Sequence, residues 1–353
     1  LATVVMPAFG QQTAAEWLEK GNAFAMQSKY DESIQAYDQA IDINPQFADA
    51  WYNKGVALGN LGKHDEALQA YDQAIDINPQ DADAWYNKGA ALSKLSKHDE
   101  ALQAFDQAID INPQDADAWY NKGNALKDLG KYDEAIQAYD QAISIDPQCA
   151  KAWNNKGSVL DDLGKYDEAL QAYDQAISID PQFAFAWYNK GNALKDLGKY
   201  DEALQAYDQA ISIDPQDADA WSNKGAALSD LGKNDVAINA YDQAISINPK
   251  LDEAWNNKGV ALEALGKNDE AIKAYDQAIS INPQYANAWY NKGVALDDLG
   301  KNDEAINAYD QAISIDPQYA DAWYKKGAAL KALGRTSESD AAFAKAEELK
   351  NAA

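Results

Sequence analysis

Tryptophan recurs every 34 residues along this chain, and that spacing constrains the fold more than any other feature. All ten tryptophans keep it: Trp17, Trp51, Trp85, Trp119, Trp153, Trp187, Trp221, Trp255, Trp289 and Trp323. A glycine follows each tryptophan by four residues, and nine prolines from Pro45 to Pro317 keep the same period. A fixed period of this length is typical of solenoids and related repeat arrays. The chain therefore divides into a segment at 1–13 and ten units: 14–47, 48–81, 82–115, 116–149, 150–183, 184–217, 218–251, 252–285, 286–319 and 320–353.

Each unit has the pattern of two helices, as the unit 48–81 illustrates. Between Asp49 and Leu61, apolar or small residues recur three or four positions apart, which predicts one face of an amphipathic helix. Gly62 supplies the left-handed residue that ends such a helix. A second helix is predicted from Asp65 to Ile77, stopped by the proline that follows.

Glycine at position 55 predicts a close contact, since glycine inside a helix costs roughly 1 kcal/mol relative to alanine. Its recurrence in all ten units indicates that a neighbouring helix comes too near for a Cβ. One hairpin cannot bury both Trp51 and Tyr71 by itself. Stacked neighbours can, so we expect stability to come from adding repeats.

The pattern of tryptophan, glycine, aromatic residue and proline at set offsets resembles the tetratricopeptide repeat family over nearly the whole chain. The resemblance implies an all-α, right-handed superhelical α-solenoid of ten helix-turn-helix repeats. It also implies that the first helix of each hairpin lines a concave surface, and that the protein is a non-catalytic scaffold that binds an extended protein or peptide segment there.

Two rows of polar residues are candidates for that binding surface. The asparagines two residues after tryptophan are Asn53, Asn87, Asn121, Asn155, Asn189, Asn223, Asn257 and Asn291. The tyrosines one residue after tryptophan are Tyr52, Tyr86, Tyr120, Tyr188, Tyr290 and Tyr324. An amide offers a donor and an acceptor to a peptide backbone, and tyrosine gives stiff contact area with a polar tip. The asparagine row resembles the ladder of O-linked GlcNAc transferase, which holds a peptide backbone. The alternative is that asparagine braces neighbouring helices and tyrosine only covers them.

A lysine row occupies a position where the resemblance implies leucine: Lys20, Lys54, Lys88, Lys122, Lys156, Lys190, Lys224, Lys258, Lys292 and Lys326. One interpretation is a stem packed between repeats with its ammonium reaching a nearby aspartate. The other is a positive spine for anionic ligands, which the flanking aspartates disfavour. The lysine that the family's chaperone-tail clamp needs directly after tryptophan is absent from every repeat.

The chain carries 57 acidic against 30 basic residues, which argues against nucleic acid or anionic lipid and favours neutral or basic ligands. No apolar run is long enough to insert into a bilayer. His64, His98 and Cys149 stand in no activating or metal-binding motif, and no glycine-rich phosphate loop is present. We therefore expect no enzyme activity, no cofactor and no metal.

The two ends of the array depart from the repeat. Residues 1–10 are apolar and resemble the end of a secretory signal, which predicts an exported or extracellular protein. The alternative is a cytoplasmic protein whose N-terminal arm covers Leu18, Phe24 and Met26 or mediates weak self-association. In the last repeat, Asp340 and Glu347 replace aliphatic residues, as a polar cap requires.

Two rival functions stay open at this point. The array could stack end to end as a self-assembling structural protein, since heterologous contacts permit open assemblies. It could also be the adaptor portion of a larger enzyme whose catalytic domain lies outside this sequence.

Overall fold

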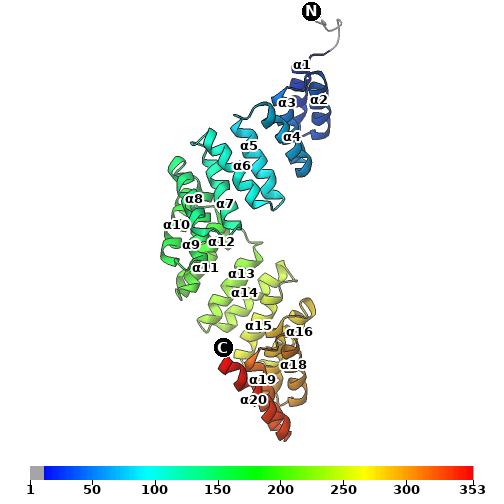
Figure 1. Cartoon of the computed structure of the whole chain (residues 1–353). Helices are drawn as coiled ribbons and strands as arrows, with labels where there is room; N and C mark the ends of the chain where they lie inside the picture. The colour runs from blue at the N-terminus through cyan, green and yellow to red at the C-terminus, as the bar shows by residue number, and fades with distance from the viewer. Residues whose placement is uncertain (1–11, 353) are drawn as a thin grey trace, which may run out of the picture. The chain divides into compact units, whose positions relative to one another are not determined.

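The computed structural model describes residues 12–352, and in this range it contains twenty α-helices and no strand (Figure 1). The first helices of the repeats are α1 (Ala14–Ala25), α3 (Ala48–Asn60), α5 (Ala82–Lys94), α7 (Ala116–Asp128), α9 (Ala150–Asp162), α11 (Ala184–Asp196), α13 (Ala218–Asp230), α15 (Asp252–Ala264), α17 (Ala286–Asp298) and α19 (Ala320–Ala332). The second helices are α2 (Tyr30–Ile43), α4 (His64–Ile77), α6 (His98–Ile111), α8 (Tyr132–Ile145), α10 (Tyr166–Ile179), α12 (Tyr200–Ile213), α14 (Asn234–Ile247), α16 (Asn268–Ile281), α18 (Asn302–Ile315) and α20 (Thr336–Ala352). The predicted all-α array of ten helical hairpins is confirmed.

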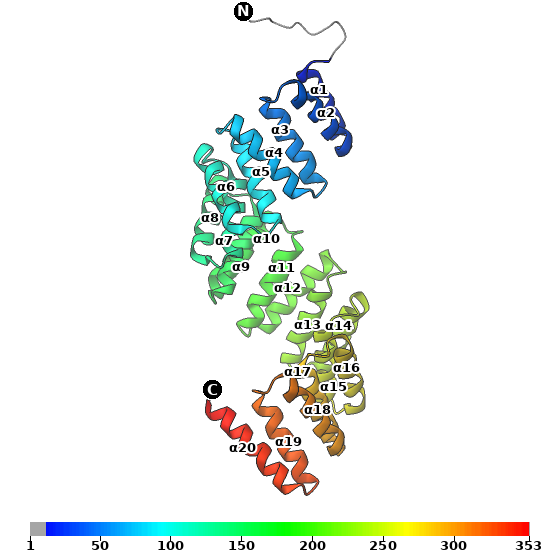
Figure 2. The ribbon, with the colours of Figure 1, turned by 45° about the vertical axis from the view of Figure 1, so that its right-hand side comes forward.

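The helices form two compact units of five hairpins each, which meet between Asp180 and Pro181. Inside each unit, the two helices of a hairpin pack together, and the second helix packs on the first helix of the next repeat (Figure 2). Successive first helices also touch each other, whereas successive second helices of the described residues do not. The hairpins of each unit are therefore closer together on the side of the first helices, and we call this side the first-helix face.

The chain reverses inside each hairpin through a residue in the left-handed region. Gly62 has a φ of +74°, as predicted, and Ser28 and Ser96 take the same conformation at φ 58° where glycine is missing. Helix starts are capped where the sequence allows it. Thr13 and Glu16 form a reciprocal capping box at α1, and Asp81 caps α5 through the backbone N–H of Ala84.

The recurring glycine makes room for the aromatic ring of the second helix in its own hairpin. A Cβ on Gly55 would lie 2.5 Å from Cε1 of Tyr71, which is too close for any real contact. Tyr71 is buried, together with Leu58 and the alanines around it. The predicted close approach is confirmed, and its partner is a ring rather than a helix backbone.

Tryptophan is only partly buried, in contrast to the fully buried core residue that the pattern favoured. Trp51 packs against Ala40 and Ile41 of the preceding second helix. Its Nε1 donates to the carbonyl of Pro45 at 3.1 Å, and Lys54 Nζ lies 5.2 Å from the ring centre. The ring is thus held by the preceding helix, a hydrogen bond and a lysine, and it stays partly exposed.

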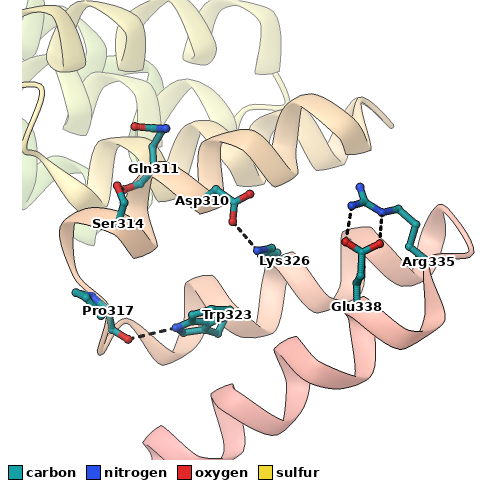
Figure 3. Close-up of polar contacts among 8 residues, drawn as sticks. All are labelled: Asp310, Gln311, Ser314, Pro317, Trp323, Lys326, Arg335 and Glu338. Atoms are coloured by element: carbon teal, nitrogen blue, oxygen red, sulfur yellow. Dashed lines mark hydrogen bonds and ion pairs between the residues drawn. The ribbon is translucent and has the colours of Figure 1, made fainter.

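The lysine row connects neighbouring repeats, as the first interpretation of it predicted. In Figure 3, Lys326 of α19 reaches Asp310 of α18 at 2.6 Å, and Trp323 donates to the carbonyl of Pro317 at 3.2 Å. The same ion pair joins Lys54 to Asp38, Lys88 to Asp72, Lys122 to Asp106, Lys156 to Asp140, Lys224 to Asp208, Lys258 to Asp242 and Lys292 to Asp276. These lysines are therefore part of the repeat interface and are not a positive spine for anions.

The terminal repeats differ from the inner ones. The last helix, α20, has 17 residues and exposes Asp340 and Glu347, as the cap prediction expects. In the first repeat, Leu18 and Phe24 are partly buried, whereas Met26 is 88% exposed. The predicted signal remnant or arm at residues 1–10 lies outside the described residues.

Candidate functional site

The predicted asparagine row lies on the first-helix face, where every member is half-buried. In the first unit, the Nδ2 of Asn87 donates to the hydroxyl of Tyr52 at 3.1 Å. The Nδ2 of Asn121 donates to the hydroxyl of Tyr86 in the same way, at 3.0 Å. The first polar row therefore bonds to the second row one repeat earlier. These hydrogen bonds are the contacts expected if the asparagines brace neighbouring helices through their amide nitrogens.

Three further asparagines bond to the residue one position earlier in the preceding repeat, whereas Asn53 donates to Asn22 of the first repeat at 3.1 Å. Asn155 donates to Tyr120, and in the second unit Asn223 donates to Tyr188. Where tyrosine is replaced by Asn256, the Nδ2 of Asn291 donates to its amide oxygen at 3.0 Å. A neutral acceptor at this position thus satisfies one amide N–H of the following repeat.

The amide oxygens of the row are less engaged than the nitrogens. Among the described residues, no hydrogen bond is made to the Oδ1 of Asn53, Asn87 or Asn223. A carbonyl oxygen on this face can accept from the N–H of a bound backbone. The amide nitrogens of the row therefore connect neighbouring repeats, and those amide oxygens that have no partner are available to a bound peptide backbone.

The tyrosine row is also half-buried, except for Tyr324, which is 52% exposed. The ring of Tyr52 lies 6.2 Å from that of Tyr71, tilted by 49°. Burial is the largest cause that raises the pKa of Tyr52, followed by the carboxylates of Asp83 and Asp81. The ring of Tyr52 is therefore held in place by Tyr71 and by the amide of Asn87, and it is only partly exposed.

Grooves open between successive first helices on this face. The groove between α1 and α3 measures about 420 Å³ and is lined by Met26, Asn53 and Val56 among others. The groove between α3 and α5 measures about 220 Å³ and includes Asn87 and Lys94. A member of the asparagine row thus forms part of the wall of each groove.

Further residues of this face were missed at the sequence level. Asn124, five residues after tryptophan, accepts from the buried hydroxyl of Tyr139 at 2.8 Å and from Asn155 at 2.9 Å. Asn192 accepts from Tyr207 and Asn223 in the same manner. The signal was available, because these positions vary between repeats and lie three residues after the asparagine row, on the same helix face.

A carboxylate takes over this acceptor role in the eighth repeat. The buried hydroxyl of Tyr275 donates to Oε2 of Glu263 at 2.9 Å. Burial raises the pKa of Glu263, and the hydrogen bond from Tyr275 opposes that shift. In the ninth repeat, the position of Glu263 is held by Asp297, and the hydroxyl of Tyr309 is buried with no hydrogen-bond partner. Aspartate is one methylene shorter, which explains why its carboxylate does not reach.

This difference predicts opposite effects for one substitution. Tyr309→Phe removes an unsatisfied buried hydroxyl, so we expect unchanged or higher stability, by up to about 1 kcal/mol. Tyr275→Phe leaves the half-buried Glu263 without its donor, so we expect a loss of about 1–2 kcal/mol. Urea unfolding of the two variants tests this directly, and equal losses would show that both hydroxyls are bonded.

Other candidate chemistry finds no support in residues 12–352. No three histidine, cysteine, aspartate or glutamate side chains of this range come together as a metal site. Cys149 is free and half-buried. No helix in the range is long and apolar enough to cross a bilayer.

Comparisons with known proteins agree with this architecture. Family models described as tetratricopeptide repeats match almost the whole repeat region, at residues 18–82, 57–116, 120–183, 172–205, 191–232, 225–266, 252–285, 274–307, 297–334 and 320–352. No curated protein matches the sequence.

Several solved structures are similar to the chain. A crystal structure of MamA is 26% identical, over 46% of this chain and 96% of that one, with a TM-score of 0.45. YrrB, whose crystal structure is described as a TPR protein with an unusual peptide-binding site, is 26% identical over 54% and 98%, with a TM-score of 0.47. Yeast Tom70 is 16% identical over 95% and 92%, with a TM-score of 0.47.

Proposed function

The chain belongs to the tetratricopeptide repeat family, whose hairpin stacks are protein-interaction scaffolds, and on that premise we propose that it binds an extended peptide segment along the first-helix face. The observation that carries the proposal is the pair of grooves between α1 and α3 and between α3 and α5, each with an amide of the asparagine row in its wall. An extended peptide presents backbone N–H groups at regular intervals, which the free Oδ1 atoms can accept.

The variation of the grooves supports selectivity on this face. Residues that line the first-helix grooves differ between repeats, as Met26 and Lys94 do. A second set of grooves, between the two helices of one hairpin, is lined by residues that recur in most repeats, such as Trp119, Lys122 and Glu134. We therefore expect the first set to contribute more to distinguishing the side chains of a bound segment.

The acidic composition favours a neutral or basic partner and disfavours nucleic acid. The family's scaffolding role supports a non-enzymatic function. An exported or extracellular location stays a proposal that rests on the apolar character of residues 1–10.

The experiment begins with peptides selected from a random display library against the whole chain. We expect Asn87→Ala and Asn223→Ala, which remove two of the free Oδ1 atoms, to weaken the selected peptides by about 0.5–1.5 kcal/mol each, the net contribution of an ordinary hydrogen bond. Calorimetric titration measures the change.

The matched control is Tyr52→Phe, which removes the hydroxyl that Asn87 braces but leaves the amide in place. Both variants should lose about 1 kcal/mol of stability through the broken brace. Only Asn87→Ala should also lose affinity. If no peptide is selected, or if the two variants bind alike, the proposal fails.

A further inference from the structure

Three carboxylates gather on the first-helix face of the second unit. Glu263 lies near the C-terminal end of α15, Asp297 holds the corresponding position of α17, and Asp298 follows it in the chain. Glu263 and Asp297 are half-buried, and Asp298 is exposed. At the position of Glu263, the second, third and fourth repeats have Gly59, Ser93 and Lys127, and the fifth has Asp161, so only the eighth and ninth repeats carry a carboxylate there in succession.

The negative charge of this cluster is not balanced. Lys325, which replaces asparagine in the last repeat, interacts electrostatically with Glu263 and Asp297. It forms no ion pair with either of them within 4 Å. Burial is the largest cause that raises the pKa of both carboxyls, and Asp298 raises both further. Three carboxylates therefore face one cation at a distance.

A buried polar atom points into the same cluster. Tyr309 is fully buried, and its hydroxyl has no hydrogen-bond partner among the described residues. The hydroxyl interacts electrostatically with Asp297, Asp298 and Glu263, all of which raise the pKa of Tyr309 after burial. An orphaned hydroxyl in this place can accept a hydrogen bond from a cationic N–H donor.

The walls beside the cluster are apolar. Val260 of α15 is 44% exposed and lies three residues before Glu263, and the partly buried Val294 of α17 lies three residues before Asp297. The ring of Tyr290 packs 6.0 Å from that of Tyr309. Lysine and arginine carry an aliphatic stem and a charged end, which matches apolar walls that lead to carboxylates.

We propose that the cluster of Glu263, Asp297 and Asp298 receives the side chain of a lysine or arginine of the bound segment, with the Tyr309 hydroxyl as an additional acceptor. The inference rests on the proposed function, and it names one chemical requirement of the partner: a basic residue that reaches the eighth and ninth repeats. Charge-assisted hydrogen bonds to two carboxylates make this contact selective against neutral side chains of the same shape.

Two small probes test the site in the whole chain. Nα-acetyl-arginine amide is cationic, and Nα-acetyl-citrulline amide has nearly the same shape without the charge. Side-chain carboxyl resonances are followed by ¹³C NMR during each titration. We expect the arginine probe to shift the Glu263 and Asp297 resonances saturably. The citrulline probe should bind at least about tenfold more weakly.

Variants locate the binding. The triple variant Glu263→Gln, Asp297→Asn, Asp298→Asn should lose the response by about tenfold or more. The control Asp196→Asn, Asp230→Asn removes exposed carboxylates at the same helix positions of the sixth and seventh repeats, and it should respond as wild type. Tyr309→Phe should weaken the arginine probe by about threefold although it does not destabilise the fold. Equal binding of citrulline, or an unchanged triple variant, overturns the inference.

The outcomes separate this inference from the proposed function. If selected peptides bind along the face but show no preference for a basic residue, the basic-residue pocket is wrong and peptide binding stands. If the arginine probe binds at the cluster but the library yields no peptide, the pocket stands and the proposed function is wrong.

Discussion

Replacing Trp119 with alanine should lower the stability of the central repeats of the first unit by about 3–4 kcal/mol. The side chain packs against Ala108 and Ile109 of the preceding repeat and against Ala142 and Ile143 of its own second helix. Alanine loses the transfer free energy of the ring and leaves a cavity, and it also removes the hydrogen bond from Nε1 to Pro113. The expected value is at the low end for an aromatic residue, since the ring keeps a solvent-facing edge.

The loss should also be local, because each repeat contacts only its neighbours. We expect hydrogen exchange to lose protection in the third to fifth repeats before the rest of the unit opens. Trp17→Ala is the matched control, because among the described residues Trp17 packs against one core cluster, that of Ala40, Ile41 and Ala50, whereas Trp119 packs against two. It should cost about 2 kcal/mol or less. An equal cost at both sites would mean that tryptophan does not couple the repeats.

Gly55→Ala should destabilise the chain by about 1–3 kcal/mol, although alanine is the better helix former. Its Cβ would lie 2.5 Å from the ring of Tyr71, which is buried and unable to move aside without disturbing its neighbours. Strain from overpacking therefore exceeds the gain of roughly 1 kcal/mol in helix propensity.

Gly59→Ala, one turn later in the same helix, provides the control. A Cβ there would lie 3.8 Å from the hydroxyl of the same Tyr71, which is an ordinary contact. We therefore expect this variant to gain up to about 1 kcal/mol. Urea unfolding of both variants measures the difference, and effects of the same sign would contradict the steric explanation.

The repeat period predicted the fold because residues 34 positions apart occupy the same place in successive helical hairpins. The helix ends at Gly62 and the close approach at Gly55 follow from properties of glycine alone, so they could be derived from the sequence. The ion pair of Lys54 with Asp38 was only one of two interpretations, because its partner lies in another repeat. The charge of these lysines alone could not decide whether they connect repeats or bind anionic ligands.

The candidate site was less predictable, for a physical reason. An asparagine offers a donor and an acceptor, and the sequence does not show which of them the neighbouring repeat uses. The hydroxyl of Tyr52 takes the amide N–H of Asn87, so the nitrogen is structural and only the oxygen is available. The cluster around Glu263 was not predictable from the period, because it arises from residues that differ between repeats.

The ion pair between consecutive hairpins has a consequence for the genetics of the array. Every junction inside a unit is closed by the same lysine, aspartate and tryptophan, as in the contact of Lys326 with Asp310. A recombination event that inserts or removes 34 residues in phase therefore rejoins two surfaces that already fit. The gene can change the length of the array without inventing a new interface, and each such event moves the variable first-helix positions by one step relative to any ligand that spans them.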